Sequence, residues 1–252
     1  MKSQAFESSG EWGTFVAYVS HRNRFTPSQK SQEFLGKILT SAKSREKTLP
    51  KGEIFLRAKI GQEGHLTEPL PYSKDHMVAP PPTEAAGGRA NPKGISYLYL
   101  SNMATTAISE VRPFLQQHVT VATFKLERDI KVIDASNDSF DIGLYIKEGK
   151  GEASSMDIEN IIWNRINVAF SSPVMLGDKS IDYIPTQYLA EFFKNNSYDG
   201  IIYASSLHKG GFNMVLFYPT SAIPIGAQVY FVRKVEYRGE PIGDPLEYPY
   251  SS

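Results

Sequence analysis

The sequence contains no cysteine, no excess charge and no long apolar run. Without cysteine, its 252 residues cannot form disulfides, use thiol catalysis or bind zinc through sulfur, which fits the reducing cytoplasm. The 27 basic and 27 acidic side chains cancel, so no net positive charge attracts nucleic acid or an anionic membrane. The most apolar region, residues 212–232, is interrupted by Pro219, Pro224 and Gly226. We therefore expect a cytoplasmic protein that binds neither membrane nor nucleic acid.

Three common catalytic motifs are also missing. The five histidines form no HExxH pair, so we expect no metal site. Ser205 and Ser206 lack the GxSxG turn of serine hydrolases. The stretch GGRANPKG (87–94) is not a Walker loop, because Lys93 is followed by glycine rather than by serine or threonine. Its backbone amides beside Arg89 suit an anion, and a tight turn with a solvated arginine explains the same residues.

The composition is typical of a folded globular chain, with 41% hydrophobic, 12% aromatic and 21% charged residues. Residues 1–50 are expected to form an accessory segment with a short amphipathic helix over 28–43, in which Phe34, Ile38 and Leu39 share a face. Residues 51–238 are expected to form the main domain, and 239–252 an extended surface tail. The length therefore favours one large domain with additions at its ends.

Apolar alternation and helical spacing divide the main domain into strands and helices. Strands are predicted at 53–60, 95–100, 119–126, 130–134, 199–205, 212–218 and 228–237. Helices are predicted after Asn102, after Ser155 and from Pro185 to Asn195, with Asn102 and Ser155 as N-caps. Because strands and helices interleave without strict alternation, the pattern favours an α+β fold over a doubly wound sheet.

The stretch from Gly61 to Lys93 is rich in proline and glycine, and predicts a long loop without regular elements. Loops of this length inside a compact domain are usually functional or cover another part of the molecule. We therefore expect residues 61–87 to act as a lid or to contact a partner.

The type and spacing of a few residues make them candidates for a catalytic or binding role. Glu110 falls off the apolar stripe of its predicted helix, as a solvated residue or a site carboxylate would. Tyr97 and Tyr99 share a strand face, either as sheet packing or as a platform for an aromatic ring. Glycoside hydrolysis usually needs two carboxylates, and Asp199 is the candidate for the second.

Three segments taken together resemble the RES-domain family. They are FLRAKI (55–60), GRANPKGISYLYLSNMATTAISEVRP (88–113) and YLAEFFKNNSYDGIIYASSLHKGGFNMVLFYP (188–219). The resemblance covers roughly residues 53–220 and lies in the order of single residues, namely Arg57, Arg89, Tyr99, Glu110, a Tyr-x-Ser step ending at Ser205, and Asn213. Characterised members of that family are bacterial toxins that destroy NAD. The resemblance implies an ADP-ribosyltransferase-like fold, a mixed or antiparallel sheet flanked by helices.

The resemblance also assigns roles to residues of this chain. Arg57 and Arg89 look like the family's arginines and would clamp the pyrophosphate of NAD. Glu110 looks like the helix carboxylate that stabilises positive charge on the ribose. Tyr99 would lie near the nicotinamide, and Ser205 would position the ribose or the carboxamide. The remaining binding residues would be Asn213 and the neighbours Tyr97 and Ser206, with NAD as substrate and no cofactor or metal required.

Several alternatives remain open at this stage. The acceptor of the ribosyl group is water or phosphate in an NAD glycohydrolase or phosphorylase, and a macromolecule in an ADP-ribosyltransferase. A catalytically silent module that binds a nucleotide or a protein would show the same residues. The chain departs from short toxins by about fifty residues before the match, by the proline-rich insertion and by the segment between Asp134 and Pro185. An inhibitor, either an antitoxin protein or residues 1–50, is expected, and homo-oligomers are not excluded.

Overall fold

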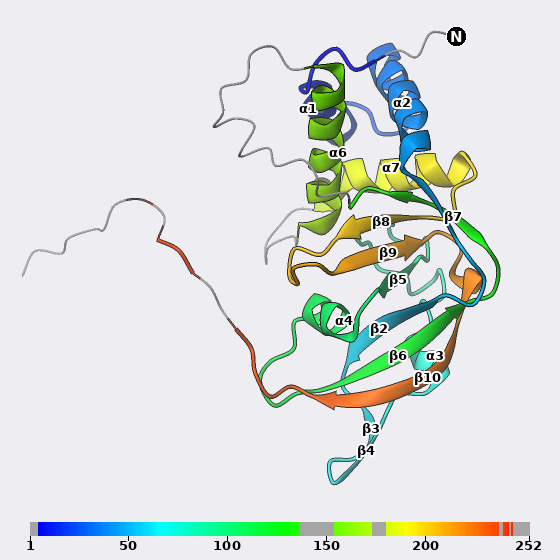
Figure 1. Cartoon of the computed structure of the whole chain (residues 1–252), viewed down its shortest axis with the longest axis vertical. Helices are drawn as coiled ribbons and strands as arrows, with labels where there is room; N and C mark the ends of the chain where they lie inside the picture. Colours follow the sequence, from blue (N-terminus) through cyan, green and yellow to red (C-terminus); the bar gives the residue numbers. More distant parts are fainter. Residues whose placement is uncertain (1–4, 137–153, 173–179, 237–238, 242, 244–252) are drawn as a thin grey trace, which may run out of the picture.

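The computed structural model describes residues 5–136, 154–172, 180–236, 239–241 and 243. These residues build an eight-stranded mixed sheet with helices on it, which confirms the α+β class (Figure 1). The strand order is β1–β7–β8–β9–β5–β2–β6–β10, and neighbours are antiparallel except β7 and β8. The strands are β1 Glu46–Leu49, β2 Ile54–Ile60, β5 Leu98–Ser101, β6 His118–Leu126, β7 Ile130–Asp134, β8 Gly200–Ala204, β9 Phe212–Leu216 and β10 Ala222–Phe231.

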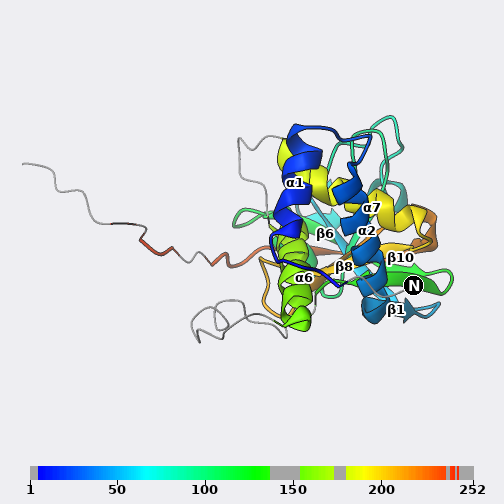
Figure 2. The ribbon, with the colours of Figure 1, turned by 90° about the horizontal axis from the view of Figure 1, so that it is seen from above.

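The helices gather mainly on one face of the sheet, as the view from above shows (Figure 2). These are α1 Glu11–His21, α2 Gln29–Ala42, α6 Ser155–Ser171 and α7 Ile184–Asn195. The shorter helix α4, Ala104–Val111, packs beside β2 and β5. No helix in the described ranges is both long enough and apolar enough to cross a membrane.

Strand alternation explains how the sheet buries both faces. Tyr97 and Tyr99 lie on the helix-covered face, while Leu98 and Leu100 belong to a second cluster that contains Phe55 of β2 and Phe124 of β6. This is the alternation that the sequence predicts for residues 95–100, although the strand itself begins at Leu98.

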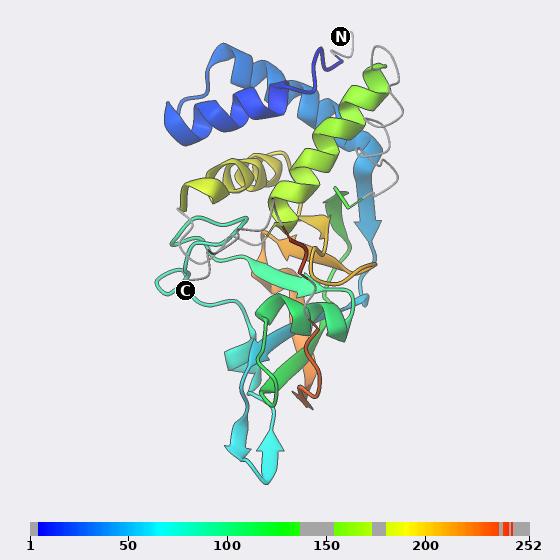
Figure 3. The same ribbon diagram turned by 90° about the vertical axis from the view of Figure 1, so that its left-hand side faces the viewer.

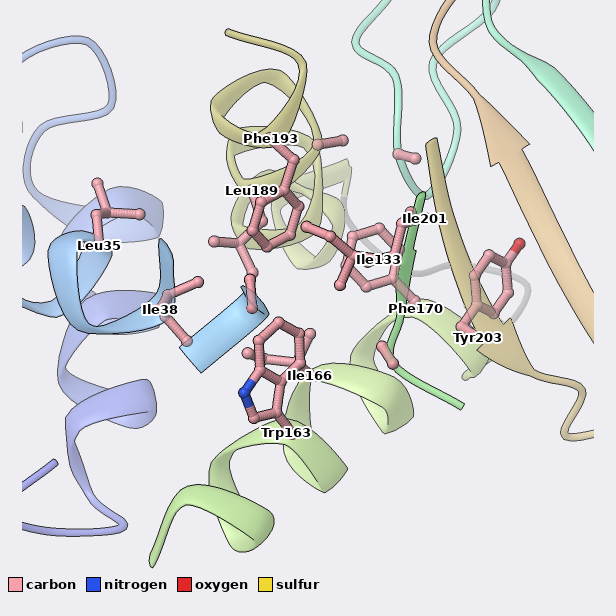
Figure 4. Packing of buried hydrophobic residues seen from close by; sticks show 14 of the residues in the cluster. Leu35, Ile38, Ile133, Trp163, Ile166, Phe170, Leu189, Phe193, Ile201 and Tyr203 are labelled. Carbon is pink, nitrogen blue, oxygen red and sulfur yellow. The ribbon is translucent and has the colours of Figure 1, made fainter. Parts of the chain in front are cut away.

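Residues 5–50 pack on the same core as the other described residues. Ile38 of α2 is buried in the cluster that contains Trp163, Leu189 and Phe193 (Figure 4). Phe34 is buried in the same cluster, and Leu39 packs against it. The sequence analysis did not predict helix α1 or strand β1. Strand β1 pairs with β7 and so forms one edge of the sheet.

Several predicted boundaries are wrong, each for a local reason. The last strand is β10, Ala222–Phe231, and not 228–237. Its proline, Pro224, is tolerated because β10 is an edge strand with a bulge between Pro224 and Gly226. Ser154, rather than Ser155, caps α6 in a capping box with Asp157.

Asn102 is not the N-cap of α4, which begins after Met103 without a side-chain cap. The Asn102 side chain instead accepts a hydrogen bond from the Phe212 amide at 2.9 Å. It therefore ties the start of α4 to strand β9.

The proline-rich stretch contains more order than predicted. Strands β3, Glu63–His65, and β4, Glu68–Leu70, form a hairpin, and a single turn of helix follows as α3, Lys74–Met77. The hairpin projects from the end of the molecule opposite α1 and α2 (Figure 3). The predicted surface tail lies outside the described residues except 239–241 and 243.

Candidate active site

A cavity of about 370 Å³ lies between α4, the strands β2, β5 and β9, and the loop around Arg89. Its volume is in the range of small-molecule sites. Its wall contains Leu56, Arg57, Ala58, Gly87, Gly88, Arg89, Tyr99, Leu100, Ser101, Ala107, Glu110, Val111, Tyr183, Tyr203 and Asn213. Five residues predicted from the sequence, Arg57, Arg89, Tyr99, Glu110 and Asn213, thus lie in one wall, although each comes from a different element of the fold.

Glu110 is held in the last turn of α4 by two donors and is not a solvated residue. Its Oε1 accepts hydrogen bonds from the Ser205 hydroxyl at 2.9 Å and from the Asn213 amide at 2.7 Å. Asn213 is itself oriented by the Ser101 hydroxyl, which donates to its carbonyl oxygen at 2.7 Å. Ser101 and Asn213 are paired across strands β5 and β9, so the sheet register fixes the carboxylate.

Arg89 lies on the other side of that carboxylate. Its Nη2 is 3.4 Å from Oε2 of Glu110, and its Nη1 is 3.5 Å from the carbonyl oxygen of Phe170. Burial alone lowers the pKa of Arg89, but the neighbouring Tyr203 and Glu110 outweigh it and raise the pKa above its ordinary value. The guanidinium is therefore charged at every physiological pH.

Arg57 is a partly buried cation on strand β2. Its Nη1 donates to the backbone carbonyl of Tyr99 at 3.3 Å, and its Nε has no hydrogen-bond partner among the described residues. Burial lowers the pKa of Arg57, partly offset by Tyr99. No carboxylate in the described part of the chain forms an ion pair with Arg57. The Arg57 guanidinium therefore contributes an uncompensated positive charge to the cavity wall.

Tyr99 forms part of the wall and fixes the loop beside it. Its hydroxyl donates to Oδ1 of Asn91 at 2.7 Å and accepts from the Ala90 amide at 3.1 Å. Burial raises the pKa of Tyr99 to about 12, so the phenol is neutral at physiological pH. Gly88 must be glycine here, because a Cβ would lie 2.8 Å from the Tyr99 hydroxyl and 2.7 Å from Oδ1 of Asn91.

Four sequence candidates lie outside the cavity wall, and of these Ser205 still reaches the site through its hydrogen bond to Glu110. Tyr97 packs on Phe217 with ring centroids 5.1 Å apart. Ser206 donates to the backbone carbonyl of Ser171 at 2.9 Å. Asp199 is at the opposite end of β8 from Ser205, where Arg128 binds it through both nitrogens. Asp199 is therefore not a second site carboxylate, and the donors to Glu110 are Ser205, Asn213 and Arg89.

Sequence reasoning missed two tyrosines of the wall, Tyr183 and Tyr203. Tyr203 could have been predicted from strand alternation. It stands two residues before Ser205, and side chains two residues apart on a strand point to the same face. Burial raises the pKa of Tyr203 far above its ordinary value, and the phenol lies near Arg89 and Glu110. Tyr183 ends a short 3-10 turn before α7 and has no comparable sequence signal.

The arrangement suits an anionic ligand that develops positive charge next to a carboxylate. Two guanidinium groups match phosphate oxygens, and a fixed carboxylate stabilises a cationic centre. Within the described ranges, no three histidine, aspartate or glutamate side chains gather as a metal site.

Comparisons with known proteins agree with the resemblance of the sequence. The family model named RES domain matches residues 59–234. No match is found among curated proteins. A solved structure, the MbcT–MbcA toxin–antitoxin complex of M. tuberculosis, is similar with a TM-score of 0.42 and 14% identity, covering 78% of this chain and 96% of that one. Since the family model spans more than half of the 252 residues, the chain belongs to the RES-domain family.

Proposed function

We propose that this protein is an NAD-consuming enzyme that cleaves the bond between nicotinamide and ribose. The observation that carries the proposal is the Glu110 carboxylate, held by Ser205 and Asn213 at a cavity whose wall also contains Arg57 and Arg89. A dinucleotide with a cationic ring and an anionic pyrophosphate needs both kinds of charge in one pocket.

The chemistry follows from the charges. When the C–N bond of NAD breaks, its electron pair leaves with neutral nicotinamide, and the ribose carbon becomes cationic. Glu110 stabilises that cation electrostatically and needs no general-acid role, because nicotinamide leaves without a proton. A water or phosphate oxygen then bonds to the ribose carbon, and water releases its extra proton to solvent.

The other wall residues bind and orient the substrate in this proposal. Arg57 and Arg89 hold the pyrophosphate through their forked donors. Tyr99, already fixed by Asn91, presents its ring toward the nicotinamide or ribose. Ser205 and Asn213 act by keeping Glu110 in place.

The decisive experiment is an NAD assay with identified products. Purified protein is expected to release nicotinamide, and Glu110→Gln is expected to reduce turnover about 100-fold or more while remaining folded. The matched control is Glu33→Gln on the exposed side of α2, which is expected to keep the wild-type rate. An unchanged rate in Glu110→Gln contradicts the proposal.

The products also distinguish the acceptors. Free ADP-ribose indicates water, a phosphorylated ADP-ribose indicates phosphate, and label retained on a macromolecule indicates ADP-ribosyl transfer. NAD binding without turnover indicates a silent module.

The biological effect in this proposal is depletion of NAD in the cytoplasm, as in the characterised toxins that the sequence resembles. A cell that makes such a protein needs an inhibitor, and we propose a separate antitoxin protein. Residues 5–50 contribute nothing to the cavity wall, so they are poor candidates for an internal block. Expression of the active protein, compared with Glu110→Gln, is expected to arrest growth as NAD falls.

A further inference from the structure

We propose that Gln187, in the first turn of α7, is a positioning residue that sets the loop carrying Arg89. The inference deepens the proposed function and rests on it, since it explains how one of the two arginines is placed for an anionic substrate. Nothing in the sequence pattern marks Gln187 beyond its place in an amphipathic helix.

Two side chains of helix α7 donate hydrogen bonds to backbone carbonyl groups of the loop that contains Arg89. The Gln187 side-chain amide donates to the carbonyl of Gly88 at 2.8 Å and to that of Asn91 at 3.2 Å. The neighbouring Thr186 hydroxyl donates to the carbonyl of Arg89 itself. Three carbonyl oxygens of the loop are thus bound from one helix turn, almost a hundred residues further along the chain.

The other side of the loop is held by residues close to it in sequence. The Asn91 side chain donates to the carbonyls of Ala86 at 2.9 Å and Ile95 at 2.8 Å, and Tyr99 binds Asn91 and Ala90. These contacts shape the loop internally. The Tyr99 hydroxyl also ties the loop to strand β5, and the bonds from α7 fix its backbone to the helical layer.

The position of the backbone matters because the Arg89 side chain is weakly held at its tip. Its contacts to Glu110 and to the carbonyl of Phe170 are long, at 3.4 and 3.5 Å, and Tyr203 is a further polar neighbour. The guanidinium therefore follows the loop, and a displacement of about 1 Å is enough to weaken binding strongly.

Gln187 is a better experimental target than Thr186. Thr186 is fully buried and also bonds to Tyr183 at the start of α7, so its removal disturbs the helix. Gln187 is half-buried, and methionine has a similar length without hydrogen-bond donors. Gln187→Met therefore deletes both loop contacts with little change in shape.

The first measurement compares steady-state kinetics of Gln187→Met with the wild type. We expect the apparent KM for NAD to rise about tenfold and kcat to stay within about threefold, because a binding contact and not the reacting carboxylate is affected. The matched control is Gln32→Met, which removes a comparable amide-to-carbonyl bond, to Pro27 at 3.4 Å, in α2. The control is expected to keep the wild-type KM.

The second measurement needs no turnover. Amide hydrogen exchange in residues 86–95 is expected to increase about tenfold in Gln187→Met, where the Gly88 amide normally bonds to the Asn91 carbonyl at 2.8 Å. Exchange elsewhere is expected to match the wild type. If the wild type does not consume NAD, the proposed function fails, while this measurement still tests the positioning role.

Three results would overturn the inference. The first is a Gln187→Met variant whose KM and loop exchange equal those of Gln32→Met. The second is a loss of kcat with unchanged KM, which would place Gln187 in the chemical step. The third is faster exchange throughout the chain, which would show general destabilisation.

Discussion

At the scale of single residues, Arg57 shows a conflict between stability and binding. The fold holds its side chain partly buried on β2, this burial lowers its pKa, and no carboxylate of the described residues forms an ion pair with it. A buried charge without an ionic partner costs free energy in the folded protein. Such a residue is kept where a ligand of opposite charge needs it.

We predict that Arg57→Met separates these two effects. Removing the buried charge is expected to leave the free energy of unfolding unchanged or raise it by about 1 kcal/mol. The apparent KM for NAD is expected to rise at least about tenfold, because a charge-assisted contact is lost. Urea denaturation and steady-state kinetics measure the two quantities. A destabilised variant with the wild-type KM would make Arg57 a structural residue.

At the scale of elements, the Tyr99 hydroxyl connects strand β5 to the Arg89 loop, and this contact predicts an alkaline limit. The folded pKa of Tyr99 is about 12 against an ordinary value of about 10, so folding favours the protonated phenol. Its contribution is complete below about pH 10 and is lost as the pH rises toward 12. Buried Tyr203 and Tyr97 act in the same direction.

The free energy of unfolding is therefore expected to fall between about pH 10 and 12, and less steeply in Tyr99→Phe. That variant is also expected to be less stable at pH 8, because Asn91 and the Ala90 amide lose their partner. Urea denaturation from pH 8 to 11.5 measures both effects. Equal slopes for the two proteins would show that Tyr99 ionises normally.

Much of the element pattern was predictable because it depends on local periodicity. The strands at 54–60, 118–126 and 130–134 match the predicted runs within one residue, since alternation of apolar side chains is a property of the segment itself. The end of the sheet was not predictable in this way. Pro224 and Gly226 indicate a break, and only the edge position of β10 lets them lie within a strand.

The sequence predicted which residues form the site better than it predicted how they are arranged. The order of residues from Arg57 to Asn213 indicated which side chains to compare, and the cavity wall contains five of them. Tertiary packing decides which face of a helix lines a cavity. The sequence spacing alone therefore could not decide whether Glu110 is a solvated residue or a site carboxylate. Thr186 and Gln187 were not predicted, because their partners are backbone carbonyl groups of a loop far away in sequence. Every residue has a backbone carbonyl, so the sequence does not show which of them accepts a bond.

At the scale of the whole molecule, the helical layer and the site share one core. Helices α1, α2 and α7 share one hydrophobic core, in which Leu35 and Ile38 of α2 lie near Leu189 and Phe193 of α7 (Figure 4). Helix α7 in turn holds the Arg89 loop through Gln187. The first fifty residues are therefore connected to the cavity through packing and not by covering it. Their removal would expose buried side chains of α6 and α7, including Trp163 and Phe193.

We predict that residues 51–252 alone do not fold cooperatively, because deletion removes α1, α2 and the edge strand β1 together. The milder variant Ile38→Ala, at a fully buried position, is expected to fold with a free energy of unfolding about 2–4 kcal/mol lower. Calorimetry and NAD turnover measure both proteins. If residues 51–252 unfold cooperatively and consume NAD at the full-length rate, this prediction is contradicted. The first fifty residues are then an accessory segment, and the position of the Arg89 loop does not depend on the packing of α1 and α2 against α7.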